Sequence, residues 1–141
     1  MAVIDADGLV LGRLCTHVAK RLLNGEEIAI VNAENAIVSG NRVQLLAFYK
    51  QRRSRGQGTH GPYYPRNADT ILKRSVRGML EYKKPSGRAA YKRLRVYVGV
   101  PESLKDQKPE TLESAKKPHL VKYVHLKDIT LELGSSRELN K

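Results

Sequence analysis

The sequence predicts an α/β fold, and two observations support this prediction. Ala2–Asp5 and Ile28–Val31 are short apolar runs of the kind found in buried strands, and an amphipathic segment separates them. Strand, helix and strand at this spacing form a βαβ unit, whose strands pair in parallel through a right-handed crossover. A length of 141 residues allows one core but not two ordinary ones, so a single domain is expected over 1–141. We expect an α/β core over 1–100 and a C-terminal extension over 101–141.

The first helix is predicted from a repeat of apolar residues. A turn containing Gly8 and Gly12 leads into it, and Asn24-Gly25 ends it. Between these signals, apolar side chains recur at the 3.6-residue period on one stripe: Leu11, Leu14, Cys15, Val18 and Leu22. The single cysteine cannot form an internal disulfide and is expected to be a small core residue.

A second helix is predicted after the turn at 37–41, where Ser39 is placed to cap it. The residues that define this helix are Val43, Leu46, Ala47 and Lys50. From about 51 to 67 the apolar repeat disappears, and a loop of this length in a compact domain is usually functional or disordered. Because few apolar side chains hold this segment, we expect it to be mobile in the free protein.

The rest of the core is predicted to hold two helices and a strand. Asp69 is a suitable N-cap for a helix over Thr70–Leu80. The apolar side of that helix is expected to contain Leu72, Val76 and Met79. Ser86 starts a shorter helix, with Ala89, Ala90 and Leu94 as its apolar positions. The alternation over Leu94–Gly99 is typical of a strand, which Pro101 closes.

The C-terminal extension begins with a segment over 101–124 that is rich in Lys, Glu and Pro and nearly neutral. This composition predicts a surface excursion. Tyr123–Leu126 is expected to be a short strand or an extended arm. A helical turn through Ile129 and Leu133 follows, and Gly134 ends it.

The distribution of charge indicates a polyanionic partner. The net charge is +12, and residues 1–40 contribute −2, residues 41–100 contribute +13 and residues 101–141 contribute +1. The middle 60 residues therefore account for the whole excess, and Asn35 to Ala68 contains no Asp or Glu. A solvated surface normally mixes both signs, so we expect this region to bind nucleic acid.

The loop with its flanks, over 49–68, is the first candidate RNA-binding segment. Arginine offers a planar fork of donors to phosphate oxygens, glycine allows close backbone approach, and Tyr63 and Tyr64 could stack on unpaired bases. The candidate contacts are Lys50, Arg52, Arg53, Arg55, Gly61, Pro62 and Arg66. The alternative, a solvated basic loop, is weakened because the segment contains no acid.

The second candidate segment starts on the helix over Thr70–Leu80. Its basic residues are Lys73, Arg74, Arg77, Lys83, Lys84, Arg88, Lys92, Arg93 and Arg95, with Gly78 among them. Like charges three or four residues apart on a helix cost roughly 0.2–0.5 kcal/mol per pair, and phosphates would reverse that sign. A lysine-rich solubilising face would usually include glutamates, and this segment offers Glu81 alone.

Other classes of function have weaker support. The longest apolar run is shorter than the ~20 residues of a membrane span, and Asp5 and Asp7 are unlike a cationic secretory signal, so we expect a soluble, cytoplasmic protein. The four histidines are scattered, and no serine lies in a nucleophile-elbow context. We therefore expect no cofactor, no metal and no small-molecule substrate.

Two alternatives stay open at this point. An enzyme could use the carboxyl edge of the sheet, where Asp5, Asp7 and Asn32 would lie. The glycines at 8 and 12 match neither a dinucleotide-binding fingerprint nor a P-loop, and a tight turn explains them better. A regulator that binds messenger RNA could use the same basic surface, and only its cellular distribution would separate it from a structural component of a ribonucleoprotein particle.

Several motifs, in this order and spacing, carry a resemblance to a known family. They are Asp5-Ala6, Leu9-Val10-Leu11-Gly12-Arg13-Leu14, Val31-Asn32-Ala33-Glu34, Ser39-Gly40-Asn41, Arg55, Gly61-Pro62, Arg66, Arg77-Gly78-Met79-Leu80 and Val96-Tyr97-Val98-Gly99-Val100-Pro101. The sequence resembles the L-thirteen family of large-subunit ribosomal proteins over roughly residues 2–101. The Gly-Pro-Tyr-Tyr-Pro-Arg spacing and the lack of a long basic C-terminal extension resemble the archaeal form. One departure is Glu81, where the family usually has proline.

The resemblance implies a three-layer α/β/α fold around a mostly parallel four-stranded sheet. It also implies a structural constituent of the large ribosomal subunit that binds and shapes ribosomal RNA early in assembly, without catalysis. The expected partners are large-subunit ribosomal RNA and neighbouring ribosomal proteins. The family motif positions carried over as RNA contacts, or as residues that shape the contact, are Arg55, Gly61, Pro62, Arg66, Arg77 and Gly78.

Overall fold

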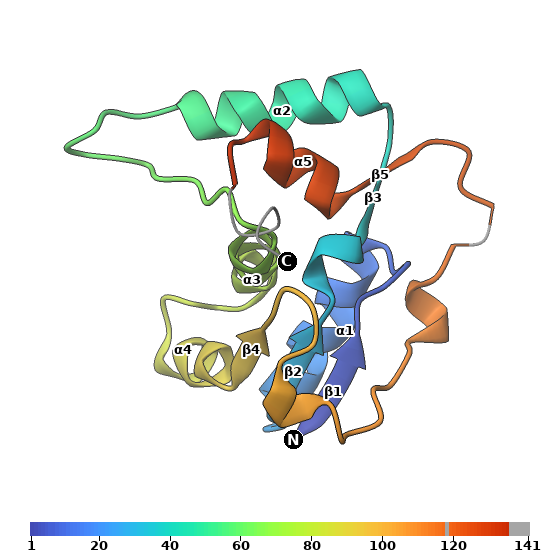
Figure 1. The fold of residues 1–141 in the computed structure, drawn as a ribbon. Helices are drawn as coiled ribbons and strands as arrows, with labels where there is room; N and C mark the ends of the chain where they lie inside the picture. The colour runs from blue at the N-terminus through green and yellow to red at the C-terminus, as the bar shows by residue number, and fades with distance from the viewer. Residues whose placement is uncertain (118, 136–141) are drawn as a thin grey trace.

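The computed structural model describes residues 1–117 and 119–135. The strands of this part are β1 (Ala2–Asp5), β2 (Ile28–Val31), β3 (Ile37–Ser39), β4 (Leu94–Val96) and β5 (Tyr123–His125). The helices are α1 (Leu11–Leu23), α2 (Arg42–Ser54), α3 (Ala68–Met79), α4 (Pro85–Lys92) and α5 (Leu126–Glu132), as drawn in Figure 1. Three 3-10 turns accompany them: η1 (Ala33–Asn35), η2 (Glu102–Leu104) and η3 (Glu113–Ala115). Among the helices of these residues, none is long and apolar enough to cross a membrane.

The predicted βαβ unit is confirmed. β1 pairs in parallel with β2, β2 pairs in parallel with β4, and α1 connects the first two strands. In the described residues this sheet has three strands, whereas the family resemblance implied four. β3 pairs antiparallel with β5 in a separate two-stranded sheet, with Ile37 opposite His125. The chain is therefore a mixed α/β protein with two small sheets.

The two faces of the three-stranded sheet are covered differently. Ile4, Ile28 and Ile30 belong to the main core, together with apolar side chains of α1, α3 and α4. The alternate residues along β2, Ala29 and Val31, face the opposite side, because successive strand residues point to opposite faces. That side is covered by side chains of the segment after β4, including Leu104 of η2, and not by the helical layer that a three-layer fold would place there.

The segment over 101–124 runs over the surface, as predicted, but its main chain is attached to β1 and to the start of α1. The main chain of Glu110 forms a parallel bridge to the free edge of β1 at Ile4: its N–H donates to the Val3 carbonyl at 2.7 Å, and its carbonyl accepts from the Asp5 N–H at 3.0 Å. Further on, the Ala115 carbonyl accepts from the Val10 N–H at 3.0 Å. An exposed strand edge invites unwanted pairing, and this segment covers it. Residues 118 and 136–141 of the predicted extension lie outside the described residues.

The second helix begins and ends later than the sequence suggested. Ser39 ends β3, and the N-cap is Asn41, whose side-chain oxygen accepts from the Val43 N–H at 2.9 Å. α2 continues to Ser54, so Arg52 and Arg53 lie on the helix and not in the loop. The last turns of α2 lack an apolar repeat because they extend beyond the core. Tyr49 is the single buried residue of the helix.

The later boundaries also shift. Asn67, not Asp69, is the N-cap of α3, and Asp69 accepts a hydrogen bond from the adjacent Thr70 N–H at 2.9 Å in the first turn. α4 starts one residue before Ser86, at Pro85, which suits a first helical turn because that turn leaves its N–H groups unpaired. β4 ends at Val96 and not at Gly99. Of the two conformations expected over Tyr123–Leu126, the strand is the one observed; it ends at His125 as β5, and Leu126 begins α5. The predicted helical turn after it is confirmed, and Gly134 has a φ of 86° just beyond.

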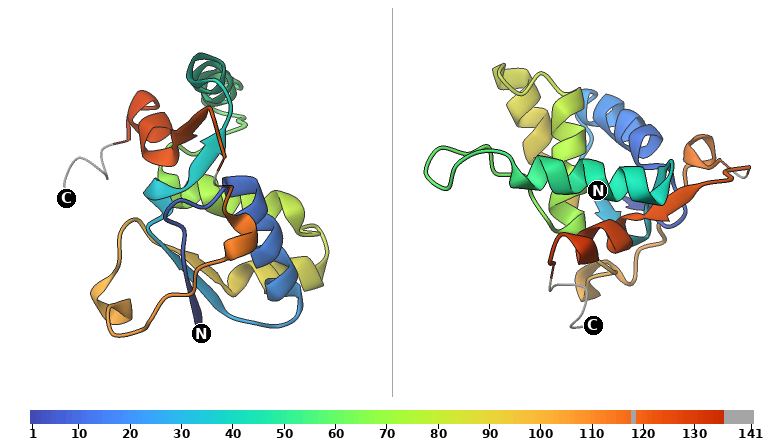
Figure 2. Two further views of the ribbon diagram at one scale, coloured as in Figure 1. Left: turned by 90° about the vertical axis from the view of Figure 1, so that its right-hand side faces the viewer. Right: turned by 90° about the horizontal axis from the view of Figure 1, so that it is seen from above.

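α2 and α5 lie together at one end of the molecule, on the far side of β3 from the three-stranded sheet (Figure 1). The connection from α2 to α3 projects away from the body, as the view from above in Figure 2 also shows. The ion pairs Arg42–Asp128 at 3.6 Å and Lys50–Glu132 at 3.2 Å link the two helices. The end of α2, the projecting loop and α3 together hold eight basic residues and one acidic residue, Asp69.

Candidate nucleic-acid interface

Two tyrosines hold the projecting loop against α2 at its return toward α3. The ring of Tyr49, which is 6% exposed, lies 6.2 Å from the ring of Tyr64 between centroids. Burial, with the neighbouring Tyr64 as a second cause, raises the pKa of Tyr49 to about 12. The Tyr64 main-chain carbonyl accepts a hydrogen bond from Arg53. Two residues of α2, Tyr49 and Arg53, therefore fix the position of Tyr64.

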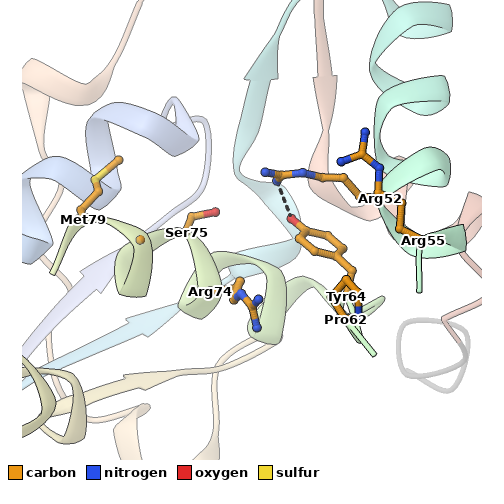
Figure 3. Close-up of a pocket in the computed structure, with 8 residues that line it drawn as sticks. Arg52, Arg55, Pro62, Tyr64, Arg74, Ser75 and Met79 are labelled. Carbon is orange, nitrogen blue, oxygen red and sulfur yellow. Dashed lines mark hydrogen bonds between the residues drawn. The ribbon is translucent and has the colours of Figure 1, made fainter. Parts of the chain in front are cut away.

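Arg52 is oriented by two aromatic rings. Its guanidinium carbon lies 4.8 Å from the ring centroid of Phe48, one helical turn earlier, and 5.1 Å from that of Tyr64. Its Nη1 donates to the Tyr64 hydroxyl at 3.5 Å, drawn as the dashed line in Figure 3. Cation–π contacts of this kind orient an exposed guanidinium without a carboxylate partner. The donor fork of Arg52 is thus presented beside an aromatic ring.

A cleft of about 500 Å³ opens between the end of α2, the loop and α3 (Figure 3). Its lining residues are Arg52, Arg55, Pro62, Tyr64, Arg74, Ser75, Gly78 and Met79. Three of these eight are arginines and none is acidic. Arg74 is about 20 positions from Arg52 and Arg55 in the sequence, and the fold brings the three into one basic site. The site lined by these eight residues is called the cleft below.

The tip of the loop closes on itself. Gln57 and Gly61 form a bridge, in which the Gly61 N–H donates to the Gln57 carbonyl at 2.9 Å, and the Tyr63 hydroxyl donates to the Gly58 carbonyl at 2.7 Å. Gly56 has a φ of 92°, and a Cβ atom there would overlap the Gly61 carbonyl group. Pro62 follows through a cis peptide bond. The candidates Gly61 and Pro62 therefore shape the loop, whether or not they contact RNA.

A second basic and aromatic site, the tyrosine cluster, comprises Lys73, Arg77, Tyr82 and Tyr91. Lys73 Nζ lies 5.0 Å from the ring centroid of Tyr91, and the Arg77 guanidinium carbon lies 4.1 Å from that of Tyr82. The two rings meet edge to face, with centroids 5.4 Å apart. Burial raises the pKa of Tyr91, and the nearby charge of Arg77 opposes this. Arg88 joins the cluster through a 3.1 Å hydrogen bond to the Tyr82 carbonyl.

The remaining candidates differ in their surroundings. Arg66, Lys83 and Lys92 are exposed. Lys50 and Lys84 form exposed ion pairs with Glu132 and Glu81, and such pairs contribute about 0–1 kcal/mol, so both lysines can exchange partners. Arg93 instead makes a contact within the protein, because its Nη2 donates to the Leu22 carbonyl at 2.6 Å, in the last turn of α1.

The cleft includes residues that sequence patterns did not single out as contacts. The sequence predicts that Tyr64 stacks on a base, but its pairing with Arg52 depends on the fold. Met79 was expected on the apolar side of its helix; it is 44% exposed and lines the cleft. The Phe48–Arg52 pair could have been recognised, because residues four apart on a helix are neighbours. Ser75 offers no such signal.

The carboxyl edge of the sheet, where an enzyme site would lie, contains hydrogen bonds within the protein. Asp5 Oδ1 accepts from the Asp7 N–H and from Asn32 Nδ2, both at 3.0 Å. The bond from Asn32 joins the ends of β1 and β2. In the part of the chain that the structure describes, His, Cys, Asp and Glu form no group of three that could hold a metal ion.

Comparisons with known proteins show the family of this chain. A family model described as Ribosomal protein L13 matches residues 1–103. The protein named large ribosomal subunit protein uL13 in Methanosarcina barkeri is 51% identical over 138 residues, covering 96% of this chain and 99% of the relative. The protein of that name in Archaeoglobus fulgidus is 48% identical, covering 94% of this chain and 86% of the relative. That in Methanocaldococcus jannaschii is 44% identical, covering 96% and 98%.

Proposed function

Since the chain belongs to the ribosomal protein L13 family, we propose that it binds large-subunit ribosomal RNA through the surface formed by the end of α2, the loop and α3–α4. Membership in this family makes the chain a structural, non-enzymatic protein of the large ribosomal subunit, with ribosomal RNA and ribosomal proteins as its partners. The surface through which it meets the RNA is the proposal.

The observation that carries this proposal is the set of arginines in the cleft. Arg52, Arg55 and Arg74 come from two helix regions and converge on one cleft whose lining residues include no carboxylate. Like charges brought together repel each other, and an isolated protein gains nothing from this arrangement. Phosphate groups of RNA would neutralise them, and the guanidinium fork matches the geometry of phosphate oxygens.

The proposed contacts extend from the cleft along the basic face. They are Lys50, Arg52, Arg53, Arg55, Gly61, Pro62, Arg66, Lys73, Arg74, Arg77, Gly78, Lys83, Lys84, Arg88 and Lys92. Arg93 is retained as a weaker candidate, because its guanidinium is partly used within the protein. Double-stranded RNA is read through shape, phosphates and 2′-hydroxyls, so we expect recognition to depend on the fold of the RNA.

We also propose that the chain acts as one domain. Ala115, Val124, Leu126 and Ile129 of the C-terminal part belong to the same apolar core as α1 and α3, which supports this view. A C-terminal extension that shares the core would stabilise the position of α3, which carries part of the basic surface.

The proposal is tested by mapping RNA crosslinks on the protein within purified large subunits. Ultraviolet crosslinking followed by mass spectrometry should place most adducts between residues 49 and 95. Adducts confined to the carboxyl edge of the sheet or to residues 101–117 would overturn the assignment of the surface. Sedimentation of a lysate through a sucrose gradient addresses the regulator alternative, because a mostly free pool of the protein would support a role away from the subunit.

A further inference from the structure

We propose that the cleft holds one unpaired nucleotide of the ribosomal RNA, with its base against Tyr64 and Met79 and its phosphate on the arginines at the rim (Figure 3). This inference rests on the proposed function, and it adds a specific site to a general basic surface. It assigns the cleft to an extruded nucleotide, where the charge alone would predict only contacts along the RNA backbone.

The size of the cleft supports a nucleotide. Pockets that enclose small molecules measure about 300–1,000 Å³, and the cleft measures about 500 Å³. Contacts along the RNA backbone require positive charge on the surface and no cavity of this size. Proteins that recognise single-stranded regions of RNA instead take unstacked bases into sites of this kind.

The walls have the chemistry that a base requires. Bases stack on aromatic rings and on guanidinium planes, and the cleft offers both, because the Arg52 guanidinium carbon lies over the Tyr64 ring, 5.1 Å from its centroid. The Ser75 hydroxyl donates to the Ile71 carbonyl at 3.1 Å, which leaves its oxygen as an acceptor for an amino group of the base. Arg55 and Arg74 supply charge for the phosphate from opposite sides of the cleft, the first from the end of α2 and the second from α3.

The wall at Gly78 is left empty by the protein. A Cβ atom built at this helical glycine meets nothing within 4 Å, so the sequence does not need glycine there for packing. Glycine within a helix is destabilising relative to alanine. Gly78 lies three and four residues after Ser75 and Arg74, on the helix face that lines the cleft. A ligand that approaches the helix backbone would explain why this space is open.

The cleft is formed before any ligand arrives. Tyr64 is held by the ring of Tyr49 and by the hydrogen bond from Arg53, and Arg52 is held by Phe48. Groups that are already ordered lose little conformational freedom on binding, which favours a specific nucleotide over diffuse contacts.

The test places a side chain at Gly78 and measures the loss of nucleotide and RNA binding. Gly78→Leu places a side chain in the cleft without removing a charge, and Gly78→Ala is the smaller variant should leucine disturb the fold. Gly12→Leu is the matched control, because Gly12 is also a helical glycine with nothing within 4 Å of a Cβ atom, and it does not line the cleft. Melting temperatures verify that each variant is folded.

Two probes are used with each variant. In the first, the four 5′-nucleoside monophosphates are titrated into the isolated protein and followed by amide NMR, with inorganic phosphate in parallel. We expect saturable shifts at Tyr64, Ser75 and Gly78 with nucleotides, none of comparable size there with phosphate, and their loss in Gly78→Leu but not in Gly12→Leu. Equal shifts with phosphate would show an anion site only and would overturn the proposal.

In the second, binding to archaeal large-subunit ribosomal RNA is measured over a range of salt concentrations. Loss of one stacked base weakens binding by about 5- to 150-fold, so Gly78→Leu should weaken it by at least about fivefold while leaving the salt dependence unchanged. If Gly78→Leu binds the RNA with wild-type affinity, the proposal is overturned. If that variant has also lost the binding of free nucleotides, the cleft is a site for free nucleotides and not for the RNA. Failure of the wild-type protein to bind the RNA would instead reject the proposed function itself.

Discussion

The guanidinium of Arg93 donates a 2.6 Å hydrogen bond to the carbonyl of Leu22, 71 positions earlier, where the last turn of α1 ends. A cation at the C-terminal end of a helix also interacts favourably with the helix dipole. Arg93 directly precedes β4, so this contact ties the end of α1 to the edge strand of the sheet.

We therefore expect Arg93→Met to lower stability more than RNA affinity. Hydrogen bonds to charged groups contribute about 1.5–3 kcal/mol, so the free energy of unfolding should fall by roughly 1–3 kcal/mol in a urea titration. Arg74→Met is the matched variant and should show the opposite pattern, with weaker RNA binding and little change in stability. A large loss of RNA affinity by folded Arg93→Met would restore Arg93 to the interface.

Gly87 is required by a close approach of two backbone segments. It is buried at the start of α4, and a Cβ atom there would overlap the carbonyl group of Glu81. Gly87→Ala should lower the free energy of unfolding by about 1–3 kcal/mol, as overpacking does. Gly12→Ala should raise it by up to about 1 kcal/mol, since that helical glycine has open space around it. Thermal and urea unfolding of both variants provide the comparison. A Gly87→Ala variant as stable as Gly12→Ala would show that α4 can shift to make room for the methyl group.

The salt dependence of RNA binding should report individual phosphate contacts. Arg55→Gln and Arg74→Gln should each reduce the slope of log K against log salt by about 0.7–0.9, the value for one phosphate contact. Lys108→Gln should leave the slope unchanged, because Lys108 lies on the extension, away from the cleft. Filter binding at several salt concentrations measures the slopes, and identical slopes in all four proteins would argue against phosphate contacts at these arginines.

Stability should fall at alkaline pH. Burial raises the pKa of the Cys15 thiol from 9.0 to about 12 and is the first cause that raises that of Tyr49 from 10.0 to about 12. Both groups hold their protons more tightly in the folded state, so their contribution is complete below pH 9 and is lost as the pH rises toward 12. The slope is at most about 1.4 kcal/mol per pH unit for each group.

Urea unfolding between pH 8 and pH 11 measures this loss. Cys15→Ala removes one of the two groups, and the decline between pH 9 and pH 10 should become shallower in that variant. A pH dependence identical to that of the wild type would mean that Cys15 stays protonated in the unfolded state as well, or that other groups control alkaline unfolding.

The loop after α2 should exchange its amide protons quickly in the free protein. Residues 55–60 are exposed, and the hydrogen bonds at the tip join neighbours of the same loop without reaching the core. Hydrogen exchange should show fast exchange over residues 55–61, slow exchange in β2, and slower exchange in the loop once RNA is bound. Strong protection of the loop in the free protein would contradict the prediction.

Local patterns were sufficient for much of the fold. The period of the apolar residues in α1 and the two apolar runs beside it predicted the parallel pairing of β1 and β2, because a βαβ unit has few alternatives. Helix ends were predicted less well. Ser39 and Asp69 were both reasonable caps by residue type, but Ser39 is taken up in β3, and Asn67 precedes α3 two residues earlier than the expected cap.

The number of strands and the cover of the sheet depended on contacts between distant segments. Ile37–Ser39 pairs with Tyr123–His125, and Leu104 covers the face of the sheet that carries Ala29. The residues after Pro101 look polar in sequence because only a few of them, such as Leu104 and Ala115, are buried. Composition averaged over such a segment hides these anchors.

The sequence by itself determined the sign and location of the charge, and with them the class of partner, because net charge and its distribution do not depend on how the chain packs. Tertiary structure alone decided which arginines lie together. Arg52 and Arg74 are 22 positions apart and meet across the cleft because Tyr49 and Tyr64 hold the loop between them, whereas Arg93, equally basic in sequence, lies against the end of α1. Charge is a property of each residue, but a binding site is a property of the distances between residues, and those are set by the packing of the core.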